Sequence, residues 1–189
     1  MPNHAILILA AGASRRLGQP KQLLAYEDGT LLNYMIKIAK EAELGPVYVV
    51  VGCKAEQIER LDAVTYIFNT EWAAGMGSSL ACGVQQIREE DVSGLILMQC
   101  DQPYVDAHLL KTISDRAAHT GSGIVICDYG IGSGPPAYFS SVYFGALSSL
   151  KGDRGAKSIV KSNEADVSAV FFPKGRHDID TIRDLDLLN

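Results

Sequence analysis

The sequence predicts a three-layer α/β fold, in which a mostly parallel central sheet carries helices on both faces. Short apolar runs rich in branched residues alternate with longer amphipathic segments along the chain. Continuous apolar runs are typical of strands that are buried on both faces of a parallel sheet. Regular alternation of strands and helices implies right-handed crossovers between parallel neighbours. The expected strands are Ala5–Leu9, Val47–Val51, Val64–Phe68, Gly94–Gln99 and Gly123–Cys127.

Three amphipathic segments between these runs predict helices, and each has a residue that can cap its start. The expected capping residues are, in chain order, Thr30, Ser78 or Ser79, and Asp106. Gly45 ahead of Pro46 ends the first helix, and Gly121 ends the third. Helices of this kind bury one apolar stripe against a sheet, which agrees with the layered fold.

The last third of the chain breaks the regular alternation. Gly130–Phe139 contains three glycines and two prolines, so we expect a loop on the substrate side that leads into a short, antiparallel strand. A final strand, Val167–Phe172, precedes an acidic turn and a last helix that begins near Thr181. No linker, repeat or low-complexity stretch divides the sequence, which predicts one domain over residues 1–189.

Composition excludes several classes of protein. The chain has 47% hydrophobic residues and a net charge of −5, which argues against disordered, collagenous and disulfide-rich proteins and against general nucleic-acid binding. The apolar run Ala5–Ala13 is much shorter than the ~20 residues that span a membrane. The four cysteines and four histidines lack the spacing of a zinc site. We expect a cytoplasmic protein that binds neither nucleic acid nor membrane.

Positive charge is concentrated near the N-terminus. Residues 1–26 contain Arg15, Arg16 and Lys21 and no acidic residue, although the chain as a whole is acidic. Such a concentration beside the first loop predicts that a small anion binds there.

That first loop, Leu9–Lys21, follows a buried strand and begins with small residues. Ala10, Ala11 and Gly12 allow backbone N–H groups to approach a ligand closely, which favours phosphate. The loop has neither the G-x-G-x-x-G pattern of dinucleotide-binding folds nor the Walker A pattern. A plain glycine turn with solvated basic side chains is the alternative interpretation.

The same loop resembles the L-A-A-G-x-S-x-R-x-G-x-P-K-x-L-L signature of nucleotidyltransferases that attach a nucleotide to molybdopterin. It is most similar to the molybdenum cofactor cytidylyltransferases, and this resemblance implies a Rossmann-like nucleotidyltransferase fold. The nucleotide-binding residues that it implies are Leu9, Ala10, Ala11, Gly12, Ser14 and Lys21. Lys21 and Arg15 are expected to offset charge on the leaving pyrophosphate. The guanylyl branch typically has a second glycine in place of Ala11, so the resemblance favours CTP.

A second loop, residues 69–80, resembles the family's N-x-x-W-x-x-G-M-x-S-S-L motif at each fixed position. It brings two hydroxyl groups and free N–H groups to a helix start, which suits contacts with a nucleobase or a phosphate. We expect Gly75, Ser78 and Ser79 to bind the nucleotide. Trp72 is expected to pack in the interior, as large aromatic side chains mostly do.

Asp101 is the strongest candidate for a metal ligand. It directly follows an apolar strand, and Mg²⁺ prefers one or two carboxylates together with substrate phosphates. The sequence C-D-Q-P at residues 100–103 matches the family motif, whose aspartate binds the metal. We therefore expect Mg²⁺ as the cofactor, with Asp101 as a catalytic residue and Gln102 able to orient the site.

The second carboxylate is expected in the segment 177–181, which resembles the D-I-D-T part of the family's tail. The resemblance favours Asp180 as the metal ligand. The sequence does not separate it from Asp178, which can instead contact the acceptor or cap the helix beside Thr181.

Two further segments, 132–137 and 150–157, resemble family motifs that shape the pterin side, where Arg154 or Lys157 can hold the acceptor phosphate. The implied reaction transfers CMP from CTP to the phosphate of the molybdenum-bound molybdopterin cofactor and releases pyrophosphate. A molybdoenzyme that receives the product is an expected partner. The alternatives are a guanylyltransferase, a nucleotidyltransferase for a sugar or alditol phosphate, and a non-catalytic carrier of the cofactor.

Overall fold

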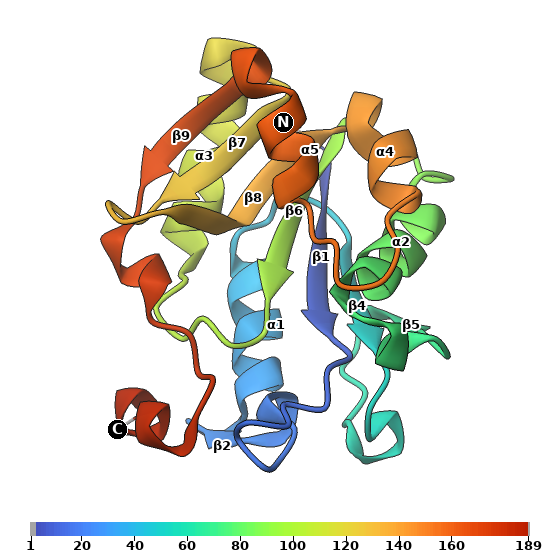
Figure 1. Ribbon diagram of the computed structural model, residues 1–189, viewed down its shortest axis with the longest axis vertical. Coiled ribbons are helices and arrows are strands. Elements are labelled where there is room, and N and C mark those ends of the chain that lie inside the picture. The colour runs from blue at the N-terminus through green and yellow to red at the C-terminus, as the bar shows by residue number, and fades with distance from the viewer. Residues whose placement is uncertain (1–2, 189) are drawn as a thin grey trace.

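The computed structural model describes residues 3–188 and contains a seven-stranded sheet between two layers of helices (Figure 1). The sheet strands are β1 (His4–Ala10), β4 (Val47–Val51), β5 (Thr65–Phe68), β6 (Gly94–Gln99), β7 (Ile124–Asp128), β8 (Ser133–Ser140) and β9 (Val167–Phe171). A small separate hairpin is formed by β2 (Ala25–Tyr26) and β3 (Gly29–Thr30). The α-helices are α1 (Leu31–Glu41), α2 (Met76–Ile87), α3 (Ala107–Thr120), α4 (Phe144–Ser148) and α5 (Lys157–Ser162).

The strand order is β5-β4-β1-β6-β8-β7-β9. β1 pairs in parallel with β4 and β6, β4 with β5, and β7 with β9. β8 pairs antiparallel with β6 and β7. The predicted α/β fold with a mostly parallel sheet is therefore confirmed. The antiparallel strand expected after Gly130 is also present, but it is eight residues long rather than short, because it forms ladders with neighbours on both sides.

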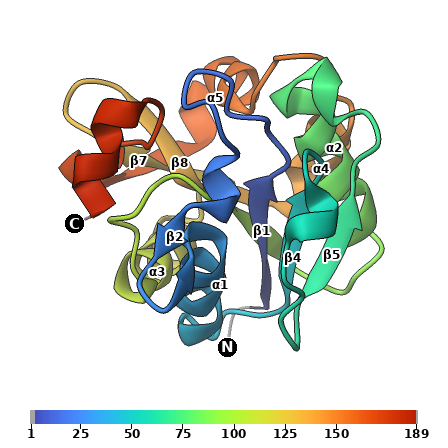
Figure 2. The same ribbon diagram turned by 90° about the horizontal axis from the view of Figure 1, so that it is seen from below.

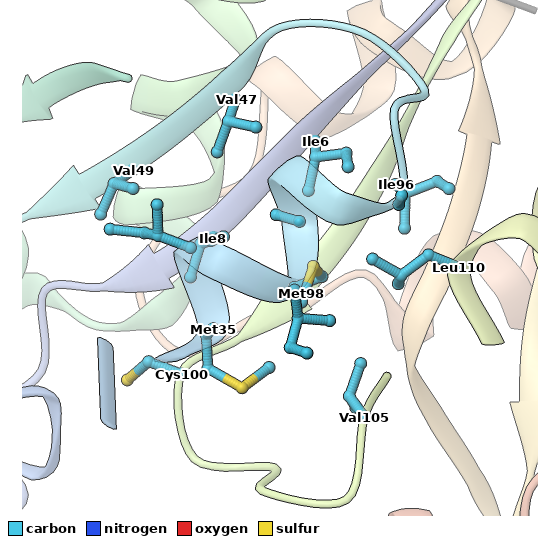
Figure 3. Packing of buried hydrophobic residues seen from close by; sticks show 14 of the residues in the cluster. Ile6, Ile8, Met35, Val47, Val49, Ile96, Met98, Cys100, Val105 and Leu110 are labelled. Carbon is cyan, nitrogen blue, oxygen red and sulfur yellow. The ribbon is translucent and has the colours of Figure 1, made fainter. Parts of the chain in front are cut away.

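Alternate residues of the buried strands pack into two separate cores. Ile6 and Ile8 lie in one core with residues of α1 and α3, whereas Leu7 lies in the other with residues of α2 and α4. The two-residue period of a strand requires this alternation. Figure 3 shows the first core, where Met35 of α1 and Leu110 of α3 gather with Ile6 and Ile8. The two cores account for the continuous apolar runs of the sequence, since both faces of the central strands are buried.

Two of the three predicted helix caps are confirmed. The side chain of Thr30 accepts a hydrogen bond from the Asn33 N–H, and that of Asp106 accepts one from the Leu109 N–H. Gly121 ends α3 in the left-handed conformation, as expected. These caps depend on residues within one turn of the helix, and local sequence therefore predicts them.

The predicted cap of α2 at Ser78 or Ser79 is wrong, because the helix begins at Met76. The N–H of Gly77 donates instead to the carbonyl oxygen of Gly152 at 2.7 Å. A Cβ on Gly75 would lie 2.6 Å from the Gly152 carbonyl carbon, and one on Gly77 would lie 2.6 Å from the Arg154 carbonyl oxygen. A distant loop therefore caps α2, and the two glycines allow that loop to approach.

The end of the chain also differs from its prediction. A 3-10 helix spans Ile182–Leu188, and neither Asp178 nor Asp180 caps it. Asp184, in the first turn of this 3-10 helix, binds the residues just before it: its Oδ2 accepts hydrogen bonds from the N–H groups of Asp180 and Thr181 at 3.0 and 2.7 Å. Among residues 3–188, no helix combines the length and the apolar character needed to cross a membrane.

The loops that carry the predicted motifs lie at one edge of the sheet. In Figure 1 the arrowheads of β1 and β6 point to this edge, and Figure 2 looks onto it from below. The loop after β1 and the C-terminal segment lie on this side in both views. In open α/β sheets, ligands bind beyond the carboxyl ends of the strands.

Candidate active site

A large cavity of about 1250 Å³ opens at the carboxyl ends of β1 and β6 and extends over β8 and β7 toward α5. The predicted site residues that line it are Leu9, Ala10, Ala11, Gly12, Ser14, Arg15, Lys21, Gly75, Ser79, Asp101, Lys157, Asp178 and Asp180. Ser78 and Arg154 are not among the described residues that line it. A pocket for one small ligand is usually about 300–1,000 Å³, so this cavity has room for two substrates side by side.

The loop after β1 is held in shape by Ser14 and Gln22. Ser14 has a positive φ of 49°, its carbonyl oxygen accepts hydrogen bonds from two later N–H groups, and its Oγ accepts one from the Lys21 N–H at 3.1 Å. The buried amide of Gln22 donates to the carbonyl oxygens of Gly12 and Cys53, both at 3.2 Å. Gly12 is exposed, and its Cβ position is open to at least 4 Å. The loop backbone is therefore fixed and accessible to a ligand at once.

Lys21 joins two of the predicted carboxylates. Its Nζ lies 2.5 Å from Asp101 Oδ2 and 2.7 Å from Asp180 Oδ1. The other oxygen of Asp180 lies 2.7 Å from Arg16 Nη2. Burial alone would lower the pKa of Lys21, but the attraction of Asp101 and Asp180 raises it above its ordinary value. At Asp180, burial would raise the pKa, but Lys21 and Arg16 outweigh it and lower the pKa of this carboxyl, so Lys21 and Asp180 are both charged near neutral pH.

Asp178 lies beside this cluster without such a partner. Its Oδ1 and the Oδ1 of Asp101 are buried, and neither has a hydrogen-bond partner within residues 3–188. Burial, reinforced by the negative charge of Asp101, raises the pKa of Asp178 to about 6. Buried carboxylate oxygens without donors are costly unless a cation or donor binds them.

These carboxylates fit a hard divalent cation. In the described part of the chain, no group of three His, Cys, Asp or Glu side chains is arranged to hold a metal ion by itself. Magnesium and manganese ions commonly bind through one or two carboxylates and complete their coordination with substrate phosphates and water. Asp101 and Asp178 each have one buried oxygen without a partner in residues 3–188, and Asp180 shares Lys21 with Asp101, so the three side chains offer ligands of that type beside the loop after β1.

The two serines of the second loop differ in their environments. The amide of Asn69 donates to Ser78 Oγ and to Ser79 Oγ, both at 3.0 Å. Ser78 Oγ also lies 2.8 Å from the carbonyl oxygens of Glu71 and Gly75, to which it can donate its proton. Ser79 accepts from Asn69 while it lines the cavity, and it shows no acceptor for its proton among residues 3–188. Of these two serines, only Ser79 therefore has a hydroxyl proton available for a ligand.

The comparison with protein families agrees with this geometry. A model described as a MobA-like NTP transferase domain matches residues 6–167, which include both glycine-containing loops and Asp101. The chain belongs to this family. Members of the MobA-like NTP transferase family are nucleotidyltransferases.

Named relatives of this MobA-like chain include proteins of more than one specificity. Purine catabolism protein PucB of Bacillus subtilis is 28% identical over 186 residues, which cover 93% of this chain and 89% of PucB. Molybdenum cofactor cytidylyltransferase of Escherichia coli is 32% identical over 111 residues, or 57% of this chain and 56% of that protein. A probable molybdenum cofactor guanylyltransferase of Bacillus mycoides is 25% identical over 127 residues, or 66% and 62%.

Solved structures show the same fold. Rv0371c from Mycobacterium tuberculosis H37Rv has a TM-score of 0.83 and 32% identity, with 98% of this chain and 97% of that chain covered. A manganese complex of Rv0371C has a TM-score of 0.77 and 29% identity, with the same coverage. A divalent metal ion is therefore bound by a structural neighbour of this chain.

Several residues of the MobA-like site were not predicted from the sequence. Gln22 fixes the first loop, Asn69 joins the two serines, and Tyr129 lines the cavity from the end of β7. Gln22 lies between Lys21 and Leu23 in the sequence, and no pattern there marks it as buried, so the sequence carried no signal for its role. Trp72 is half-buried and packs against the second core as expected, but it also lines the cavity.

Proposed function

We propose that this protein transfers CMP from CTP to the phosphate of the molybdenum-bound molybdopterin cofactor and releases pyrophosphate. The observation that carries the proposal is a single cavity with room for two substrates, with the basic first loop and three carboxylates at one end. Membership of the MobA-like family supports nucleotidyl transfer. The relatives named for molybdenum cofactor chemistry support the acceptor.

In the proposed reaction, an oxygen of the acceptor phosphate forms a bond to the α-phosphorus of CTP. The bond from this phosphorus to the bridging oxygen of the β-phosphate breaks, and pyrophosphate leaves with the electron pair. The acceptor oxygen is already anionic near neutral pH, so no general base has to remove a proton. Catalysis then consists of positioning the substrates and neutralising charge. Lys21 and Arg15, beside the first loop, would offset negative charge on the leaving group.

Asp101 is the proposed first ligand of Mg²⁺, with Asp180 as the second carboxylate and Asp178 beside them. When bound, the ion would supply charge neutralisation at the phosphates. Lys21 bridges Asp101 and Asp180, which keeps the two carboxylates together despite their mutual repulsion. The manganese complex of a structural neighbour supports a divalent ion in general.

Ala11 supports the choice of a pyrimidine nucleotide. Ala11 is almost fully buried and lines the cavity, so its methyl group narrows the space for a base. The Ser79 hydroxyl can donate to an acceptor of either base, such as N3 of cytosine or O6 of guanine, so it contributes binding without choosing between them. Ala11→Gly should therefore raise the ratio of GTP to CTP turnover, and an unchanged ratio would argue against this basis for specificity.

The decisive experiment incubates the protein with Mg²⁺, the molybdenum-bound cofactor and either CTP or GTP, followed by identification of the dinucleotide and of released pyrophosphate. We expect the cytosine dinucleotide. A guanine dinucleotide would instead establish a guanylyltransferase, which the similarity to the Bacillus mycoides relative favours. Pyrophosphate release only with a sugar or alditol phosphate would identify another acceptor. Retention of the cofactor without any pyrophosphate release would identify a carrier.

A further inference from the structure

Gln102 is a buried polar residue next to the proposed metal ligand Asp101. Its side chain is 2% exposed, and its Nε2, which carries two hydrogens, lies 3.1 Å from each of three acceptors from separate segments. These acceptors are the Tyr129 hydroxyl, the Pro135 carbonyl and the Gly175 carbonyl. Two of them are carbonyl oxygens, which accept but do not donate, so the orientation of the Gln102 amide is fixed.

The contact with Gly175 reaches the turn that carries the other two carboxylates. This turn, residues 175–180, is held at its start by Gln102 and near its end by the Ile179 N–H, which donates to the Asp101 carbonyl oxygen at 2.9 Å. Ile179 is completely buried among leucines. These two attachments lead to the dipeptide 101–102, and the side chain of Asp180 adds ion pairs with Lys21 and Arg16 at the end of the turn. At the start of the turn, the side-chain attachment is the one made by Gln102.

We propose that Gln102 is a positioning residue that sets the spacing between Asp101 and the carboxylates of Asp178 and Asp180. The inference rests on the proposed function, because it assigns these carboxylates to a divalent ion. Gln102 does not line the cavity in the described part of the chain. It acts through the turn, since loss of its amide releases the first half of the turn while the Ile179 contact holds the second half.

Tyr129 connects the turn to the neighbouring strands. Its ring packs so closely on Gly175 that a Cβ there would lie 2.6 Å from Tyr129 Cδ1, and its hydroxyl donates to the Pro135 carbonyl oxygen. The Gln102 amide thus fastens the turn to the ends of β7 and β8 as well as to Asp101. A residue that only filled space at position 102 would not need a donor.

The test replaces Gln102 by methionine, which has similar length and no donor. Binding of Mn²⁺ alone is measured from the electron paramagnetic resonance signal of the free ion, and kcat and KM for CTP are measured separately. Loss of groups that orient metal ligands typically weakens metal affinity about 10–100-fold. We expect weakening of that size for Gln102→Met, with a lower kcat and a KM for CTP within about twofold of the wild type.

Leu110→Ala serves as the matched control, because Leu110 is buried on α3 in the first core, whereas Ile179 of the turn belongs to a separate hydrophobic cluster. It should lower thermal stability at least as much as Gln102→Met and leave Mn²⁺ affinity and kcat unchanged at a temperature where both are folded. If Gln102→Met does not fold, Gln102→Asn keeps a donor on a shorter side chain and should show the same loss of affinity to a smaller degree.

The inference is overturned if the folded Gln102 variants bind Mn²⁺ with wild-type affinity. It is also overturned if Leu110→Ala loses as much affinity as they do, or if the wild-type protein does not bind Mn²⁺. The binding measurement needs no nucleotide or pterin. A protein that binds Mn²⁺ through these residues but transfers no CMP would refute the proposed function and leave the role of Gln102 intact.

Discussion

The two ends of strand β1 bury ionisable groups in opposite ways. Beyond its carboxyl end, Lys21 and Asp101 are largely buried as charged partners. At its amino end, His4 is buried beside Ser93 and Tyr138, and burial lowers the pKa of the His4 ring, which favours the neutral form. Burying charge is costly unless it is paired. The protein thus keeps buried charge where phosphate and metal are proposed to bind and a neutral ring at the opposite end.

The largest expected effect comes from removing the charge of Asp101. Asp101→Asn keeps the shape of the side chain but removes the proposed metal ligand and one partner of Lys21. Loss of preorganised charge stabilisation at a single group costs on the order of 10²–10³-fold in rate, and we expect at least the upper value for kcat. Steady-state pyrophosphate release measures the effect, and thermal unfolding verifies that the variant is folded. Activity within tenfold of wild type would remove Asp101 from the mechanism.

Asp180 and Asp178 both lie near Lys21, but we expect their substitutions to have different effects. Asp180→Asn removes the partner of both Lys21 and Arg16, so we expect a loss of kcat close to that of Asp101→Asn. Asp178→Asn should lose less activity and should stabilise the folded protein, because burial raises the pKa of Asp178 and its buried Oδ1 has no hydrogen-bond partner within residues 3–188. Relief of a buried polar mismatch of about 1–3 kcal/mol would raise the Tm by roughly 2 °C or more in a chain of this size. The reverse order of activities would make Asp178 the metal ligand.

Substitution of the two uncharged serines, Ser78 and Ser79, is expected to have smaller effects. Ser79→Ala removes a donor worth about 1 kcal/mol and should raise the KM for CTP several-fold with little change in kcat. Ser78→Ala removes a hydroxyl that contacts Glu71 and Gly75, so it should mainly lower the Tm. Equal effects of both variants on KM would contradict the assignment of Ser79 alone to the ligand.

The smallest effect is expected at the amino end of β1. The pKa of His4 in the folded protein lies below its ordinary value of 6.5. As the pH falls below about 6.5, the unfolded chain takes up a proton that the folded protein does not, so the free energy of unfolding decreases. Urea unfolding of the wild type and of His4→Gln at pH 5.5 and 7.5 measures this difference. The variant should lose less stability on acidification, and an equal loss in both proteins would show that other groups dominate.

Local sequence predicted the fold well because its signals are short-range. Apolar runs marked β1, β4 and β6 within one residue, and Thr30 and Asp106 cap their helices through hydrogen bonds three residues away. The start of α2 escaped prediction, because its cap is the carbonyl of Gly152, which is distant in the sequence. The candidate site shows the same contrast between local and distant contacts. Motif matching singled out Asp101 and Lys21, but it did not single out Gln22, whose buried amide joins two loops.

The sequence by itself therefore determined the alternation of the parallel strands with α1, α2 and α3 and the identity of the loops that carry charge, but not the hairpin of β2 and β3 or the short helices α4 and α5. It placed a small basic segment at the start of an acidic chain, but it could not say which acids face that segment. Only the tertiary structure decided that Lys21 lies between Asp101 and Asp180, with Asp178 half-buried beside them and Ser79 lining the cavity. The physical reason is that apolar periodicity acts within one element, whereas burial and charge pairing depend on segments that meet only when the sheet is complete.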